Sequence, residues 1–234
     1  MPTANFQQSS GDPVYQLLGD ALLQKTDRLR HGCVGCPVAC EHRFEPPTAH
    51  SGTRAVRLEY QSVYALGPLC GIHDLPVIID AAALCDTPGM DTVSMGATIA
   101  WAMESFERGV LTIEQTGGLD LTFGNSAALI ECIQLTARRE GLGVLLAGGS
   151  LRAAQSLGGG SEVWTMQVKG LEMPGYDPRH HIGLGMGLAM SARGACHNRA
   201  RLGLDVEPLP GDPDSPSNPD SSPAGGISRE DRQS

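Results

Sequence analysis

The clearest indication of the fold is the segment Thr92-Val-Ser-Met-Gly-Ala-Thr-Ile-Ala-Trp-Ala-Met-Glu-Ser-Phe-Glu-Arg108. Small and apolar side chains alternate along it at helical intervals, and Gly109 follows as the type of residue that most often ends a helix. Glycine and alanine are plentiful in the whole chain, which favours helices that pack closely together. The stretch therefore predicts a helix over residues 92–108 within a closely packed helical core.

Other segments carry similar helical signals. A capping aspartate followed by proline, Asp12-Pro13, predicts the start of a first helix. Apolar periodicity predicts further helices over residues 76–84, 126–140 and 145–157, whereas residues 163–168 favour a brief strand. No internal repeat is visible. The sequence thus predicts a mainly α, multi-helical fold over residues 12–204, flanked by a disordered N-terminus at residues 1–11.

The last thirty residues differ in composition from the rest. Residues 205–234 hold six of the 16 prolines and seven acidic against two basic residues, so they supply −5 of the formal net charge of −9. Such a segment buries too little apolar surface to offset the entropy lost on ordering. We therefore expect a disordered, acidic tail rich in proline and serine.

Composition also restricts the class of protein. The 234 residues are 41% hydrophobic, enough for a core, and the net charge of −9 argues against a nucleic-acid partner. No run of 18 apolar residues is present, which argues against a membrane-spanning helix. An odd number of cysteines, seven, without a visible secretion signal indicates a reducing, cytoplasmic setting.

Three of these cysteines form the run Cys33-Val-Gly-Cys36-Pro-Val-Ala-Cys40. This C-x2-C-x3-C spacing lets one short loop direct three thiolates at a single centre, which is typical of iron–sulfur clusters. A zinc site and three packing thiols remain alternatives, although zinc more often shows paired C-x2-C units or added histidines. Local disulfides do not account for three neighbouring thiols. We interpret the run as a redox-active cluster site.

Four further motifs follow in order. They are Glu59-Tyr60-Gln61, Asp86-x-x-Gly89-x-Asp91, Lys169-Gly170-x-Glu172-x-Pro174 leading into Asp177-Pro178-Arg179, and Arg193-Gly194-Ala195-Cys196-His197. Together with the cysteine run, in this order and at these separations, they resemble the aldehyde ferredoxin oxidoreductase family. Members of that family carry a tungsten bis-pterin cofactor beside a [4Fe-4S] cluster. The resemblance covers residues 22–199 and implies the family's helical second and third domains.

The resemblance implies roles for individual residues. By the family's pattern, Cys33, Cys36 and Cys40 are three cluster ligands, and the fourth ligand lies further along a complete member. Pterin contacts are implied for Asp86, Gly89 and Asp91, and cofactor proximity for Asp177 and Arg179. The turn at residues 86–91 is also explained as a cap of the next helix. Cys70, Cys85, Cys132 and Cys196 are expected to be buried, as lone cysteines often are.

Two residues are implied to be catalytic. Glu59 stands where the family has an active-site glutamate and would move a proton, while His197 would donate a hydrogen bond to a carbonyl oxygen. The alternative for Glu59 is a solvated or ion-paired residue beside Arg57, and the alternative for His197 is a purely structural role. The chain departs from the family at Gln61, where an amide replaces a carboxylate, and at residues 147–149, where many members carry a glutamate.

The function implied by the resemblance is oxidation of an aldehyde to a carboxylic acid, with electrons passing through the [4Fe-4S] cluster to ferredoxin. Tungsten and molybdenum both remain open as the pterin-bound metal. The sequence shows no counterpart of the family's N-terminal platform or far C-terminus, so we expect a fragment. The alternative is a non-catalytic remnant or one piece of a split enzyme that binds only the cluster, completed by another polypeptide or a second copy of the chain.

Overall fold

A computed structural model describes residues 1–9, 30–32, 34–35, 41–44, 55–179 and 182–200. The three cysteines of the cluster motif, Cys33, Cys36 and Cys40, lie outside these residues, as do the helix predicted to begin at Asp12-Pro13 and the predicted disordered tail.

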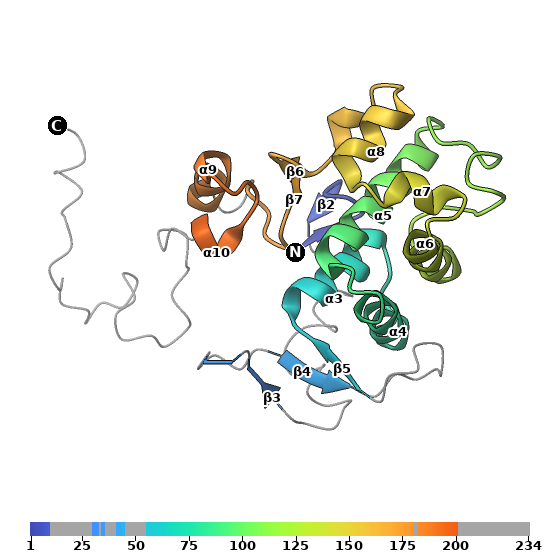
Figure 1. The fold of residues 1–234 in the computed structure, drawn as a ribbon. Coiled ribbons are helices and arrows are strands. Elements are labelled where there is room, and N and C mark those ends of the chain that lie inside the picture. The colour runs from blue at the N-terminus through green and yellow to red at the C-terminus, as the bar shows by residue number, and fades with distance from the viewer. Residues whose placement is uncertain (10–29, 33, 36–40, 45–54, 180–181, 201–234) are drawn as a thin grey trace, which may run out of the picture.

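Helices dominate the described residues, which confirms the predicted fold class. They are α3 (Tyr60–Leu66), α4 (Leu75–Asp86), α5 (Thr92–Glu107), α6 (Ser126–Arg138), α7 (Leu142–Leu146), α8 (Ser150–Leu157), α9 (Ile182–Met190) and α10 (His197–Ala200), with 3-10 turns η2 (Pro68–Cys70) and η3 (Ser161–Trp164). Helix α5 is central, with Ile99, Trp101 and Met103 fully buried in the core. The other long helices surround it (Figure 1).

Helices α3 and α5 approach one another at a glycine. A β-carbon at Gly96 would lie 2.9 Å from the Ala65 β-carbon and closer still to the Ala65 carbonyl group, so only hydrogen fits there. The buried Cys70 thiol lies at the same crossing, 3.5 Å from the Ala65 carbonyl oxygen and 3.4 Å from that of Gly96. The small residues of the Thr92–Arg108 stretch therefore allow the close packing that the sequence predicts.

Polar side chains fix the helix starts. Asp91 accepts a hydrogen bond from the Ser94 N–H at 2.7 Å, and Asn125 accepts one from the Ala128 N–H at 3.2 Å. Both satisfy backbone donors that the first turn of a helix leaves unpaired. At the other end of α5, Gly109 has a φ of 70°, which confirms its predicted place just beyond the helix.

Two sequence predictions need correction. Residues 145–157 form two helices, because Gly149 has a φ of 81° and breaks the segment between α7 and α8. The segment 163–168 is mostly not a strand: it contains the end of η3 and a two-residue strand, β6 (Gln167–Val168). Helix α3 was not predicted, since it is only seven residues long and almost entirely buried, so its sequence shows no polar face.

The strands are short and form three small antiparallel groups. Their bounds are β1 (Pro2–Thr3), β2 (Gln8–Ser9), β3 (Arg30–His31), β4 (Glu41–Phe44), β5 (Val56–Leu58), β6 and β7 (Leu171–Glu172), paired as β1-β2, β3-β4-β5 and β6-β7. The three-stranded group lies below α3 and α4 in the view, and the β6-β7 hairpin lies between α8 and the α9–α10 pair (Figure 1).

The N-terminal residues are ordered, contrary to the disorder predicted for residues 1–11. Residues 1–9 form the β1-β2 hairpin, whose tip inserts Asn5 into the core with 1% of its surface exposed. The Asn5 amide donates to a Glu104 carboxylate oxygen at 2.6 Å and to the Trp164 carbonyl at 2.9 Å. Polar burial of this kind leaves no apolar signal in the sequence, which explains the wrong prediction.

Within the described residues, no single helix has the length and apolarity needed to cross a membrane. The pair Tyr60–Cys70 and Leu75–Asp86 meets those criteria only together, across a bend of 115°. Most side chains of both helices are buried in the core of the chain itself.

Candidate functional site

A cavity of about 160 Å³ brings together residues from four of the recognised motifs. Its wall is formed by Gln61, Asp91, Val93, Ser94, Leu171, Glu172, Pro174, Arg193, Ala195, Cys196, His197 and Asn198. These residues come from α3, from the start of α5, from β7 and from the start of α10, which are far apart in the sequence. Of the predicted site residues, the structure places Asp91 and His197 together in this wall.

Glu172 is a buried carboxylate in the wall that the sequence analysis assigned no role. It is 5% exposed, and one of its oxygens accepts hydrogen bonds from the Ser150 N–H and hydroxyl, both at 2.9 Å. The other accepts from the Ser94 hydroxyl at 2.8 Å. Glu172 thus ties the first turns of α5 and α8 to the β6-β7 hairpin. The signal for it was a charged residue between the apolar residues Leu171 and Met173.

The space beside Glu172 depends on a glycine. A β-carbon at Gly149 would lie 3.0 Å from a Glu172 carboxylate oxygen. Gly149 also lines a neighbouring hollow of about 220 Å³ that shares Asp91 and Ser94 with the cavity. The departure from the family at residues 147–149 therefore falls at the border of the candidate site.

Gln61 contributes an amide whose orientation is fixed. Its side-chain oxygen accepts a hydrogen bond from the buried Gly175 N–H at 2.7 Å, so the amide nitrogen occupies the other position. That nitrogen is buried and has no hydrogen-bond partner among the described residues. Gln61 therefore borders the cavity, but its amide nitrogen is buried and has no acceptor in this part of the chain.

His197 lies at the end of a row of aromatic rings. The rings of Tyr60 and Tyr176 are stacked with centroids 5.5 Å apart, and the His197 ring lies 5.4 Å from Tyr176 at 53°. The Tyr60 hydroxyl donates to the Gly175 carbonyl at 2.6 Å, which anchors the row. Because ring packing restricts side-chain rotation, this row holds the imidazole at the cavity wall.

The turn at residues 86–91 caps the next helix and borders the cavity. The Asp91 carboxylate caps α5, as the structural alternative requires, and it also lines the cavity. Gly89 has a φ of 75°, and a β-carbon there would meet no atom within 4 Å, so its surroundings are open. Burial raises the pKa of Asp86, although the positive charge of Arg57 opposes this effect. Asp86 and Gly89 lie outside the cavity wall.

Glu59 lies at the start of α3, where its side chain accepts a hydrogen bond from the Ser62 N–H at 3.0 Å. Burial raises the pKa of Glu59, and the negative charges of Glu41 and Asp91 add to this, while backbone N–H groups lower it. The neighbouring ion pair joins Arg57 to Glu41 at 3.0 Å. Glu59 does not line the cavity. The negative charge of Asp91, which does, contributes to the raised pKa of Glu59.

The raised pKa of Glu59 leads to a testable prediction about how stability depends on pH. Because the folded pKa of Glu59 exceeds its unfolded value near 4.5, the folded state binds the proton more tightly. The associated stabilisation is complete below the unfolded pKa and is lost as the pH rises through the folded pKa. We expect Glu59→Gln, which keeps the cap to Ser62, to flatten the dependence of unfolding free energy on pH above the unfolded pKa of Glu59.

Urea unfolding at several pH values measures this dependence. Glu59→Ala serves as the comparison, since it also removes the charge but loses the cap, at a cost of about 1 kcal/mol. An unchanged pH dependence in both variants would contradict the raised pKa.

Asp177 and Arg179 form a local unit directly after Tyr176 in the sequence. The Arg179 guanidinium makes a two-pronged contact with the buried Asp177 carboxylate, at 2.6 Å for the shortest pair, and donates to the Phe6 carbonyl at 3.0 Å. Neither residue lines the cavity. In this part of the chain the pair attaches the N-terminal hairpin to the segment that carries Tyr176.

The remaining cysteines behave as predicted. Cys70, Cys85, Cys132 and Cys196 are buried and free. Burial raises the pKa of the Cys85 and Cys132 thiols to about 12, so they are protonated and unreactive at neutral pH. The described residues contain no group of three His, Cys, Asp or Glu side chains arranged to hold a metal ion.

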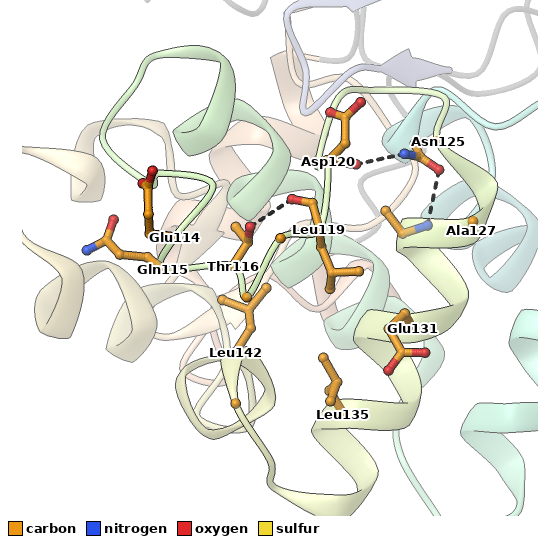
Figure 2. Close-up of a pocket in the computed structure, with 14 residues that line it drawn as sticks. Glu114, Gln115, Thr116, Leu119, Asp120, Asn125, Ala127, Glu131, Leu135 and Leu142 are labelled. Carbon is orange, nitrogen blue, oxygen red and sulfur yellow. Dashed lines mark hydrogen bonds between the residues drawn. The ribbon is translucent and has the colours of Figure 1, made fainter.

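A larger hollow, of about 730 Å³, lies on another face between the loop 114–120 and the helices α6 and α7 (Figure 2). Its polar groups mainly hold the loop in shape: the Thr116 hydroxyl donates to the Leu119 carbonyl at 2.7 Å, and the Asn125 amide to the Asp120 carbonyl at 2.8 Å. No predicted site residue lines it, so we place the candidate site at the smaller cavity.

Comparison with known proteins gives one matching family model, "Aldehyde ferredoxin oxidoreductase, domains 2 & 3", over residues 1–229. The tungsten-containing aldehyde ferredoxin oxidoreductases of Pyrococcus furiosus and Thermococcus kodakarensis are each 40% identical over 197 residues, which is 84% of this chain and 32% of theirs. The chain thus spans about a third of the length of these relatives.

Two more distant similarities were found. The WOR-like subunit of the Pyrococcus furiosus aliphatic sulfonate oxidoreductase is 29% identical over 164 residues, covering 68% of this chain and 24% of that subunit. The solved active-site complex BamBC of benzoyl coenzyme A reductase, bound to 1,5-dienoyl-CoA, matches with a TM-score of 0.61 at 19% identity, covering 80% of this chain and 29% of that one. The latter similarity supports the fold alone.

Proposed function

Because the chain belongs to the aldehyde ferredoxin oxidoreductase family, we propose that it forms part of an enzyme that oxidises an aldehyde to a carboxylic acid. The reaction consumes the aldehyde and one water and yields the acid, two protons and two electrons. The relatives that match it are named as tungsten-containing oxidoreductases. The substrate and electron acceptor of this chain are part of the proposal.

The observation that carries the proposal is the shared cavity. Asp91 and His197 are 106 positions apart in the sequence, yet both line one cavity beside the buried Glu172. His197 would donate a hydrogen bond to the aldehyde oxygen and polarise the carbonyl. Glu59, with a raised pKa, would accept a proton released on oxidation. Both roles need the side chains to remain fixed, which the aromatic row and the helix cap support.

The residues of the 86–91 turn fit a pterin. The open space beside Gly89 leaves room for a ring system to approach the backbone, and the carboxylates of Asp86 and Asp91 are acceptors for ring N–H and amino groups. When bound, a tungsten or molybdenum bis-pterin would accept the two electrons. Asp177 and Arg179 would hold the segment before α9 in place against it.

We further propose that Cys33, Cys36 and Cys40 bind a [4Fe-4S] cluster that passes electrons to ferredoxin. The support is the one-loop spacing of the three thiols. A cluster of this kind requires reduced cysteines, which favours the cytoplasm. The fourth ligand would come from the remainder of the protein, a complementing polypeptide or a second copy of the chain.

The alternative function is that of one cluster-binding piece of a split enzyme, or of a remnant without activity. The region that matches is 32% of the relatives' length. On this alternative the chain binds iron and sulfide but does not oxidise aldehydes on its own.

The test combines cofactor content with turnover. The chain is produced together with the remaining parts of such an enzyme in a host that makes the metal pterin, and aldehyde-dependent dye reduction is measured. We expect His197→Ala to lower turnover at least tenfold while metal and iron contents stay normal, because the variant removes a donor without touching the proposed ligands.

Changing Cys33, Cys36 and Cys40 together to serine should abolish iron binding. The control is His73→Ala, which alters an exposed histidine just before α4. Normal turnover in the His197 variant would refute its role. Iron uptake without any aldehyde oxidation, even in the completed enzyme, would favour the alternative function.

A further inference from the structure

The loop between α5 and α6 is long and has a fixed shape. It runs over residues 108–125 without a helix or strand, and loops of this length within a compact domain usually carry a function. The Thr116 hydroxyl holds the loop by donating to the Leu119 carbonyl at 2.7 Å, and the Asn125 amide holds it by donating to the Asp120 carbonyl at 2.8 Å. The hollow of about 730 Å³ between this loop, α6 and α7 is therefore formed before any partner binds.

The floor of this hollow is apolar. Leu119 of the loop, Leu135 of α6 and Leu142 of α7 lie at its centre (Figure 2). Leu119 and Leu135 are partly exposed, so part of their apolar surface is accessible. Two exposed apolar side chains, Ile113 at 41% and Val144 at 64%, belong to the same loop and to α7. Exposed apolar surface with a polar rim is typical of sites that bind other proteins.

Carboxylates form the rim. Glu114, Asp120 and Glu131 line the hollow around the leucines, and its described wall contains no lysine, arginine or histidine (Figure 2). A hydrogen bond from the Thr112 side chain lowers the pKa of Glu114, so this group is ionised at neutral pH. Arg138 forms an ion pair with Glu131 at 3.6 Å, but both side chains are at least 41% exposed, so this pair is weak. The rim therefore carries net negative charge.

We propose that this hollow binds a short segment of a partner polypeptide in which leucine-like side chains alternate with lysine or arginine. The leucine floor buries the apolar side chains of the segment, and the carboxylates of the rim attract its cations. An acidic segment is repelled, because no positive charge in the wall offsets the three carboxylates.

The exposure of the rim favours a polypeptide over a small molecule. Glu114, Gln115 and Asp120 are exposed, so the hollow opens to the surface, whereas small-molecule sites usually enclose most of their ligand. The hollow shares no lining residue with the cavity that contains His197. The proposal therefore does not depend on aldehyde oxidation, and either can fail without the other.

The experiment uses the full chain and synthetic peptides with blocked ends. The probe is Lys-Leu-Arg-Leu-Lys, and two controls each keep half of its chemistry. Lys-Ser-Arg-Ser-Lys keeps the charges without the leucines, and Glu-Leu-Glu-Leu-Glu keeps the leucines with the opposite charge. Nitrogen-15 NMR follows the backbone amide signals during each titration. We expect saturable shifts within residues 114–142 for the probe, at least a tenfold higher Kd for the serine peptide and no binding of the glutamate peptide.

Removing the charges of the rim should raise the Kd of the probe at least tenfold. The rim variant combines Glu114→Gln, Asp120→Asn and Glu131→Gln. Its matched control makes the same types of change at exposed carboxylates elsewhere, and combines Asp74→Asn, Glu107→Gln and Glu162→Gln. The two variants have the same net charge, so only a site at the hollow distinguishes them. Raising the salt from about 50 mM to about 500 mM should weaken binding to the unmodified chain, because salt screens exposed charges.

Several results would overturn the proposal. No saturable shift with the probe, or an equal loss of affinity in the two variants, would show that the hollow is not the binding site. Equal affinity for the serine peptide would show attraction of cations without docking. Butylammonium that bound as tightly as the probe would make the hollow a site for a small organic cation. Shifts of the same signals with protein concentration, without peptide, would make it an interface between copies of this chain.

Discussion

Gly96→Ala is expected to lower the free energy of unfolding by at least about 3 kcal/mol, a large part of the 5–15 kcal/mol typical of a folded domain. An alanine within a helix ordinarily stabilises it by about 1 kcal/mol relative to glycine. Here the added β-carbon would meet backbone atoms of Ala65, which cannot rotate away as a side chain can. The two helices would have to separate, and the buried contacts along α3 and α5 would be lost.

Urea unfolding followed by circular dichroism measures the effect. Ala127→Gly is the control, because Ala127 is exposed in the first turn of α6, so its change leaves no cavity and should cost no more than about 1 kcal/mol. If Gly96→Ala proved as stable as the unmodified chain, the close crossing of α3 and α5 would be wrong.

Arg108→Met is expected to cost about 3 kcal/mol by leaving a buried carboxylate without its cation. The Glu104 side chain is 3% exposed and binds the Arg108 guanidinium at 2.7 Å. Arg108 also lies over the Trp164 ring, 4.6 Å from its centroid, so the change removes a cation–π contact as well. Asn5 would remain as a donor to Glu104, which limits the loss.

Arg138→Met tests whether burial is the cause. Arg138 forms ion pairs with Glu131 at 3.6 Å and Glu140 at 2.8 Å, but all three side chains are at least 41% exposed. Such surface pairs contribute about 0–1 kcal/mol, so this variant should be close to the unmodified chain in the same urea titration. If both variants lost the same free energy of unfolding, the buried ion pair would contribute no more to stability than the exposed ones.

The fold was predictable wherever local signals agreed. For α5, Asp91 caps the start, the small residues form a packing face, and Gly109 marks the end. The observed helix agrees with the predicted bounds to within one residue. Helix α3 and the N-terminal hairpin were missed because neither carries a periodic pattern: the first is buried on almost all sides, and the second is held by the polar contacts of Asn5.

The candidate site was predictable only in part. The motifs drew attention to Asp91 and His197, which share the cavity, and to Asp177 and Arg179, which do not. Glu172 and the free amide of Gln61 were not assigned roles, since their significance depends on which groups of Ser94, Ser150 and Gly175 lie beside them. Motifs in the sequence do not predict hydrogen bonds between residues that lie so far apart in the chain.

The N-terminal hairpin closes two long loops of the chain. The Asn5 amide donates to the Trp164 carbonyl, 159 residues later, and the Phe6 carbonyl accepts from Arg179, 173 residues later. Contacts between residues so far apart form more slowly than local ones, because more chain entropy is lost when they close. We therefore expect these two contacts to form late in folding, after the local turns of the helices.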